Sequence, residues 1–291
     1  MSARFDRDTG SVAIIVRGPA ADPPADLAEA ARQGAAFWPL AVTRELDDLI
    51  LDLRTNEPEL GTWVFRTEGD AARVLAYDEL LLAPDWFARE VLHYLKRTLR
   101  RLDVTSRSLL AVIEPGSCFA GSLLELALAA DRSFQLAGVF QDTDPEAEPA
   151  AVTLGDINFG PLTMSNGLTR LQTRFWGDDA SAEAVGKRRG AALEAEDAAD
   201  LGLITFAPDD IDWDEEIRIA IEERASFSPD ALTGLEANYR FAGPETMETK
   251  IFGRLSAWQN WIFNRPSASG PDGALRRFGT GQRAVFDRKR V

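Results

Sequence analysis

The 291-residue sequence is poor in the two side chains that most often build metal sites, with one cysteine (Cys118) and one histidine (His93). A single cysteine excludes an internal disulfide and any metal site built from several cysteines. A single histidine argues against a histidine-rich metal site and leaves only one imidazole for a Ser-His-Asp arrangement. We therefore expect no metal, and we expect acid–base chemistry in this chain to rely on carboxylates.

Long apolar runs and excess positive charge are also missing. No run approaches the ~18 apolar residues that span a membrane, and the opening MSARFDRDTG lacks the apolar stretch of a signal peptide. We therefore expect a cytoplasmic protein. The formal net charge of −15 argues against nucleic acid or an anionic membrane as a partner.

Strand and helix patterns alternate through the first two thirds of the sequence, which predicts an α/β core with mostly parallel strands. Proline signals then separate three helical stretches, at 213–226, 229–240 and 245–263. We place a boundary near Pro208, with a core at 1–208 and a helical subdomain and tail at 209–291. Strands are expected at 12–17, 62–67, 109–113, 133–136 and 152–154; helices are expected at 42–53, 71–82, 86–102 and 166–176, and a helix running into a strand at 192–203.

The most informative stretch is Leu109 to Asp131, LLAVIEPGSCFAGSLLELALAAD. It predicts a buried strand, a turn with Pro115 and Gly116, and a helix opened by Gly121. Residues 122 and 125 have the S-x-x-E spacing of a capping box. An exposed helix N-terminus presents backbone N–H groups that can hold a developing negative charge.

This construction resembles the enoyl-CoA hydratase (crotonase) superfamily, whose corresponding segment ends in E-L-A-x-x-x-D. The segment GDINFG at 155–160 is similar to the superfamily's P-E-x-x-x-G, and ALEAEDAADLGLIT at 192–205 is similar to its A-x-x-A-x-x-x-G-L-V signature. The stretch Asn238 to Phe263, with the GxxGAL, GTG and FDRKRV motifs after it, resembles the benzoyl-CoA-dihydrodiol lyase family, a ring-opening branch.

The resemblance implies a crotonase-like spiral of ββα units with a C-terminal helical subdomain, and specifically the second of the two crotonase-like domains of that family. It implies a carbon–carbon lyase that opens the oxygenated ring of 2,3-epoxy- or 2,3-dihydrodiol-benzoyl-CoA, in aerobic benzoate catabolism, to a CoA-bound semialdehyde plus formate. The acyl-CoA thioester is the substrate, and no cofactor is implied. A homo-oligomer or a partner crotonase-like domain is expected.

Five residues are candidates for the site. By the resemblance, Glu125 and Asp156 direct water and move protons, and the backbone N–H groups of Gly121 and Ser122 hold the thioester oxygen, beside Cys118. Structural interpretations stand against these roles. Glu125 would complete the capping box, Asp156 would form a turn, and Cys118 would be a small buried apolar residue.

Two features leave other functions open. The superfamily's second oxyanion donor comes from a Gly-Ala-Asp run, and the corresponding region here, Ala76-Tyr77-Asp78, has no glycine. A catalytically silent domain that supports a separate catalytic domain is therefore one alternative, and an enoyl-CoA hydratase or isomerase is another. The apolar stripe at Ile251, Leu255, Trp258 and Ile262 packs either on the core or on another crotonase-like domain.

Overall fold

The computed structural model describes residues 1–290, and a five-stranded sheet with the order β1-β2-β3-β4-β5 forms its centre. The first pair is antiparallel and the other three pairs are parallel. The strands are β1 (Ser2–Asp6), β2 (Ser11–Arg17), β3 (Thr62–Glu68), β4 (Ser108–Ile113) and β5 (Arg132–Gln135). The sequence analysis did not predict β1, although its residues, SARFD, alternate between polar and apolar side chains. All five residues are exposed, at the edge of the sheet.

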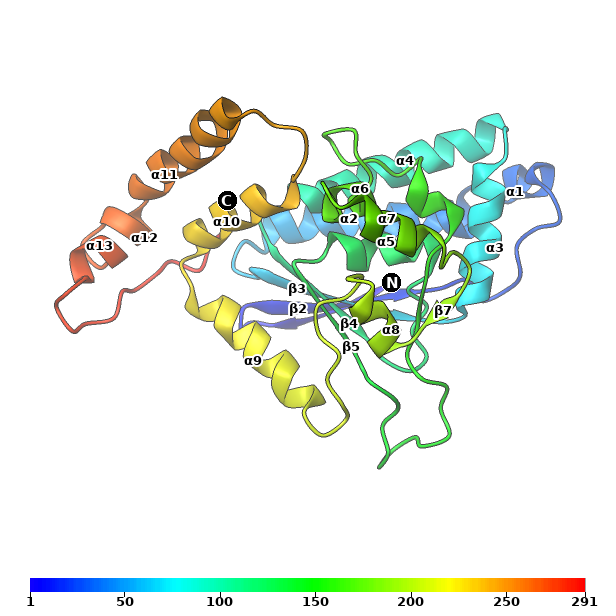
Figure 1. Cartoon of the computed structure of the whole chain (residues 1–291), viewed down its shortest axis with the longest axis horizontal. Helices are drawn as coiled ribbons and strands as arrows, with labels where there is room; N and C mark the ends of the chain where they lie inside the picture. The colour runs from blue at the N-terminus through cyan, green and yellow to red at the C-terminus, as the bar shows by residue number, and fades with distance from the viewer. Residues whose placement is uncertain (291) are drawn as a thin grey trace.

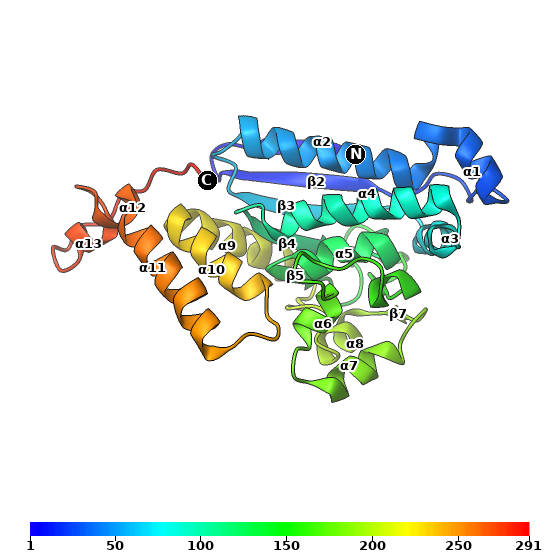
Figure 2. The ribbon, with the colours of Figure 1, turned by 90° about the horizontal axis from the view of Figure 1, so that it is seen from above.

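Three helices run alongside one another against the sheet (Figure 2). They are α2 (Trp38–Asn56), α4 (Trp86–Asp103) and α5 (Gly121–Ala129). At the start of α4 the side chain of Asp85 accepts hydrogen bonds from the amides of residues 87 and 88. One apolar face of the helix, with Val91, Leu95 and Leu99, is buried. Strand β4 is buried at all six positions, as expected for a central parallel strand. Helices α1 (Leu27–Gln33), η1 (Gly34–Ala36) and α3 (Ala71–Leu82) complete this region.

Short elements follow β5 and differ in part from the predicted ones. The expected helix at 166–176 is confined to α6 (Arg170–Arg174), because Gly167 and its neighbours form a turn instead. At 192–203, where the sequence predicts a helix followed by a strand, the structure has a short strand followed by a helix. The elements here are β6 (Val152–Thr153), η2 (Asp156–Phe159), α7 (Asp179–Gly186), β7 (Ala192–Leu193) and α8 (Ala195–Asp200), with β6 and β7 paired antiparallel.

The C-terminal helices begin on the sheet and then lead away from it (Figure 1). Trp213, at the start of α9, is 1% exposed and donates from its indole nitrogen to Glu114 at 2.8 Å, so α9 shares the main core. The later elements lie farther from the sheet. They are α9 (Trp213–Ser226), α10 (Pro229–Arg240), η3 (Thr249–Leu255), α11 (Ser256–Phe263), α12 (Pro266–Ser269) and α13 (Ala274–Arg277).

The predicted apolar stripe at 251–262, which runs along η3 and α11, divides into two parts. Trp258 and Ile262 pack on α10 at Gly234, where an added Cβ would lie 2.9 Å from the Ile262 Cδ1 atom. Ile251 and Leu255 remain exposed. The division at Pro208 stays a prediction. No helix within residues 1–290 is both long enough and apolar enough to cross a membrane.

Candidate functional site

The N-terminus of α5 is already occupied by a side chain from α3. The helix begins at Gly121, and its N-cap residue, Ala120, makes no side-chain capping hydrogen bond. The predicted capping box is therefore wrong: Ser122 lies inside the helix and Glu125 turns away from it. In its place, Asp78 Oδ2 accepts a hydrogen bond from the Ser122 amide at 2.6 Å.

Asp78 is 3% exposed, and this burial decides its protonation. Desolvation raises the pKa of the carboxyl from 3.8 to about 7, although hydrogen bonds from Ser122 act in the opposite direction. Its second oxygen, Oδ1, has no hydrogen-bond partner within the described residues. Asp78 therefore holds a carboxyl group in front of the Ser122 amide, where the resemblance places the thioester oxygen.

The close approach of Asp78 also explains the glycine at the start of the helix. Gly121 has φ +44°, a left-handed conformation, and an added Cβ there would lie 2.0 Å from Asp78 Oδ2. The Gly121 carbonyl accepts a hydrogen bond from Asn158 Nδ2 at 2.8 Å. Leu75 lies against Gly121 as well, so protein atoms surround this helix end.

Cys118 lies in the turn before the helix and is fully buried. Its amide donates to the Thr67 hydroxyl at 2.9 Å, and its sulfur lies against Gly18 and Gly69. Burial raises the pKa of the thiol, which makes it a poor nucleophile. This placement matches the interpretation of Cys118 as a small core residue, and its role in substrate binding stays a prediction.

Glu125 is fully buried inside an ionic network. Its carboxylate accepts from Asn158 Nδ2 at 2.7 Å and from Arg170 Nη1 at 2.8 Å, and Arg170 also donates to Asp103 at 2.8 Å. Desolvation raises the pKa of Glu125, and Arg170 opposes this change. Arg170 holds the orientation of the Glu125 carboxylate from the side opposite Asn158.

The structure does not bring the two predicted carboxylates together. The Asp156 side chain is 72% exposed and pairs with Arg189 Nη1 at 2.9 Å, and the Arg189 guanidinium lies 3.7 Å from the centre of the Phe159 ring. Glu125 faces the interior while Asp156 faces solvent. Their roles in moving protons therefore stay predictions, and the shared cavity that a two-carboxylate mechanism needs is not formed by these two side chains.

A second charged cluster, which the sequence did not predict, lies beyond the other end of α5. Asp131 accepts from Arg240 at 2.6 and 3.0 Å and from the amide of residue 109 at 2.7 Å. Glu236 accepts from Ser108, and Arg290 donates to the same serine at 2.9 Å. Arg290, near the C-terminus of the chain, is only 7% exposed. The one available signal was the i,i+4 spacing of Glu236 and Arg240 on one helix.

Metal-binding groups are not evident in the described part of the chain. Within residues 1–290, no three or more His, Cys, Asp or Glu side chains are placed to hold a metal ion. The single histidine, His93, is exposed on α4.

Comparison with solved structures identifies the fold. The chain superposes on an enoyl-CoA hydratase/isomerase from Cupriavidus metallidurans with a TM-score of 0.64 at 17% identity, covering 100% of this chain and 97% of that one. An enoyl-CoA hydratase from Mycobacterium smegmatis gives a TM-score of 0.63 at 13% identity, with 98% of each chain covered. This protein therefore has the crotonase fold, as the sequence predicted. No family model matches the chain.

A curated relative makes the similarity specific. Over 293 aligned residues, covering all of this chain, the sequence is 54% identical to the benzoyl-CoA-dihydrodiol lyase of Aromatoleum evansii. The resemblance to that lyase is thus confirmed. The chain spans about half of the relative's length, 52%.

Proposed function

We propose that this chain forms one crotonase-like half of a ring-opening lyase that acts on a benzoyl-CoA derivative. The observation that carries the proposal is 54% identity over the whole chain to half of a benzoyl-CoA-dihydrodiol lyase. The reaction proposed is the opening of the oxygenated ring of 2,3-epoxy- or 2,3-dihydrodiol-benzoyl-CoA to a CoA-bound semialdehyde plus formate. The CoA thioester is the substrate, no cofactor is assigned, and the proposed location is the cytoplasm.

The geometry of α5 favours a supporting role for this half. An oxyanion site works through donors aimed at the position where the charge develops, and that position must be free for the substrate. Here the Ser122 amide donates to Asp78, and Glu125 is fixed by Arg170 and Asn158. We therefore propose that the thioester binds to another crotonase-like domain of the lyase, and that this chain supports it. Similarity to enoyl-CoA hydratases at 17% identity or less supports the fold alone.

The surface that meets the other domain is proposed to be the outer face of η3 and α11. Phe252 is 70% exposed, Leu255 is 61% exposed and Ile251 is 38% exposed, and all three lie on η3. Apolar side chains gathered on one protruding helix are typical of an interface. Because the chain covers only half of its relative, the occupant proposed is the remaining crotonase-like half of the same lyase.

Formate release tests the proposal. The purified chain is measured alone and mixed with the remaining half of the lyase, using the dihydrodiol and epoxide forms of benzoyl-CoA. We expect turnover only in the mixture, and we expect Glu125→Gln to leave kcat within about twofold in a mixture that still assembles. No formate from the mixture would refute the lyase proposal. Turnover by the chain alone that Glu125→Gln abolishes would instead assign the chemistry to this half.

Association is measured separately, by sedimentation of the same two halves. Phe252→Glu and Leu255→Glu are expected to weaken the complex, because each places a charge in an apolar contact. Ile219→Glu, on the exposed side of α9, is the matched control, since Ile219 is 47% exposed outside the proposed face. If all three variants assemble equally well, this face is not the interface.

A further inference from the structure

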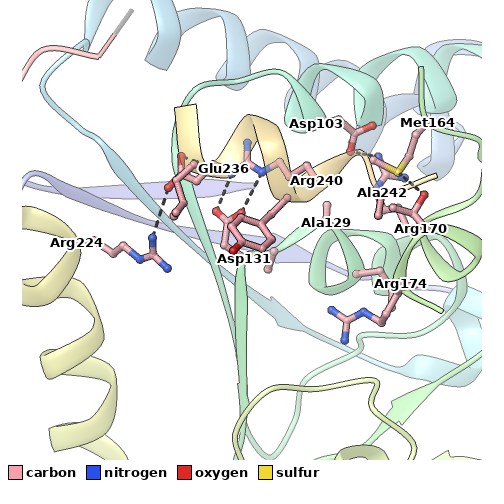
Figure 3. Close-up of a pocket in the computed structure, with 15 residues that line it drawn as sticks. Asp103, Ala129, Asp131, Met164, Arg170, Arg174, Arg224, Glu236, Arg240 and Ala242 are labelled. Carbon is pink, nitrogen blue, oxygen red and sulfur yellow. Dashed lines mark hydrogen bonds and ion pairs between the residues drawn. The ribbon is translucent and has the colours of Figure 1, made fainter. Parts of the chain in front are cut away.

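A cavity of about 380 Å³ lies at the C-terminal end of α5, between α6, α9 and α10 (Figure 3). It is at the opposite end of α5 from Gly121, about 12 Å away along the helix axis at 1.5 Å per residue. The cavity is therefore separate from the predicted thioester site. Its volume falls in the range that small organic ligands occupy in proteins.

The polar part of the cavity wall contains four arginines and three carboxylates. Each carboxylate already has a strong partner: Asp131 pairs with Arg240, Asp103 pairs with Arg170, and Glu236 accepts from Ser108. Glu125 and Arg290, which complete the network behind the wall, add one charge of each sign. The wall therefore keeps an excess of positive charge.

Two arginines of the wall lack a close carboxylate partner. Arg224 is 9% exposed, its nearest carboxylate oxygen, on Glu236, is 3.8 Å away, and its Nε atom has no hydrogen-bond partner within the described residues. Arg174 donates at 2.8 Å to two carbonyl oxygens, of Gly202 and Leu203, and forms no ion pair within residues 1–290. Figure 3 shows these two side chains entering from opposite sides. Arg224 is therefore weakly paired with Glu236, whereas the partly buried Arg174 has no counter-charge within residues 1–290. A guanidinium without a counter-charge at a cavity wall favours an anion beside it.

The remaining wall is apolar and shapes the ligand's other end. Leu128, Ala129 and Met164 are buried, and Tyr239 presents its ring at the exposed edge. A ligand that matches both the arginine-rich wall and the apolar wall has one anionic group and a small apolar body. We propose that this cavity binds a small organic monocarboxylate, with its carboxylate beside Arg174 and its apolar body along α5. This site is independent of the proposed lyase function.

Titration calorimetry of the full chain at pH 7 with benzoate and with benzamide tests this proposal. The two probes have the same shape, and only benzoate carries a charge. We expect benzoate to bind at least tenfold more tightly, because a charge-assisted hydrogen bond is about twice as strong as a neutral one. Equal affinity for the two probes, or no heat with benzoate at 10 mM (about 3 kcal/mol of binding free energy), would overturn the proposal.

Two variants locate the binding. Arg174→Gln is expected to weaken benzoate at least tenfold, whereas Arg188→Gln, which removes an exposed arginine paired with Asp197, is the matched control and is expected to change nothing. Ala242→Leu fills the cavity edge without touching any charge and is expected to reduce binding as well. Binding that survives both Arg174→Gln and Ala242→Leu would place the carboxylate elsewhere and refute this site. Neither measurement depends on thioester turnover, so the cavity proposal is tested separately from the proposed lyase function.

Discussion

Replacing Asp78 by asparagine should change how the stability of the protein depends on pH. The asparagine keeps an oxygen to accept from the Ser122 amide and removes the titrating group. In the native state burial raises the pKa of Asp78 to about 7. A carboxyl whose pKa is raised on folding stabilises the native state below the unfolded pKa. That stabilisation is lost as the pH rises through the native pKa.

The size of the effect follows from the two pKa values. The native chain retains the proton between pH 3.8, the ordinary value, and about 7, while the unfolded chain has lost it. Each pH unit in that window changes the free energy of unfolding by about 1.4 kcal/mol, so the total is about 4 kcal/mol. Asp78 is fully desolvated, so no discount for solvent screening applies. Above pH 7 the ionised group therefore destabilises the fold by about that amount.

Urea unfolding of the wild type and of Asp78→Asn at pH 4, 6 and 8 measures this difference. The two proteins should be nearly equal in stability at pH 4, where both carry a neutral group at position 78. Asp78→Asn should become the more stable of the two by several kcal/mol at pH 8. Other titrating groups cancel in the difference between the two proteins. A difference that stays constant from pH 4 to pH 8 would refute the reasoning.

Three further substitutions test the packing and charges around α5. Gly121→Ala should lower the free energy of unfolding by about 2–5 kcal/mol, because φ at this position is left-handed and the added Cβ would collide with Asp78. Combining it with Asp78→Gly, which removes the collision, should restore the larger part of that lost free energy. Arg170→Met should cost about 3–5 kcal/mol in chemical denaturation, because it leaves two buried carboxylates unpaired, whereas Arg189→Met, at an exposed ion pair, should cost less than about 1 kcal/mol. Arg290→Gln should lower Tm, since its guanidinium bonds to a buried serine; an unchanged Tm would show that this tail contact contributes nothing.

Local patterns predicted the main elements well. The continuous apolar run of β4 and the spaced apolar face of α4 are properties of neighbouring residues, so the sequence displays them directly. The S-x-x-E motif failed for a physical reason. The helix starts at Gly121, so Ser122 lies inside it, and the Glu125 carboxylate accepts from Arg170 and Asn158 and not from the helix N-terminus.

The candidate site was less predictable because its partners are far apart in sequence. Asp78 and Ser122 are separated by 44 residues, and Arg290 and Ser108 by 182. The residues next to an aspartate or an arginine in the sequence do not indicate whether its side chain is buried, or which distant residue it contacts. The excess of buried arginine around the α5 cavity therefore emerges only from the fold.

The placement of Asp78 has a consequence for any search for ligands of this half. A group tethered to the same chain acts at an effective concentration that is commonly millimolar or higher, so a dissolved thioester competes with it at a constant disadvantage. Screening the unmodified chain would thus miss molecules that bind the Ser122 amide more weakly than the tethered Asp78 carboxyl does. Asp78→Gly, which withdraws the tethered competitor and leaves the Ser122 amide in place, is the form of the protein on which such a screen should be run.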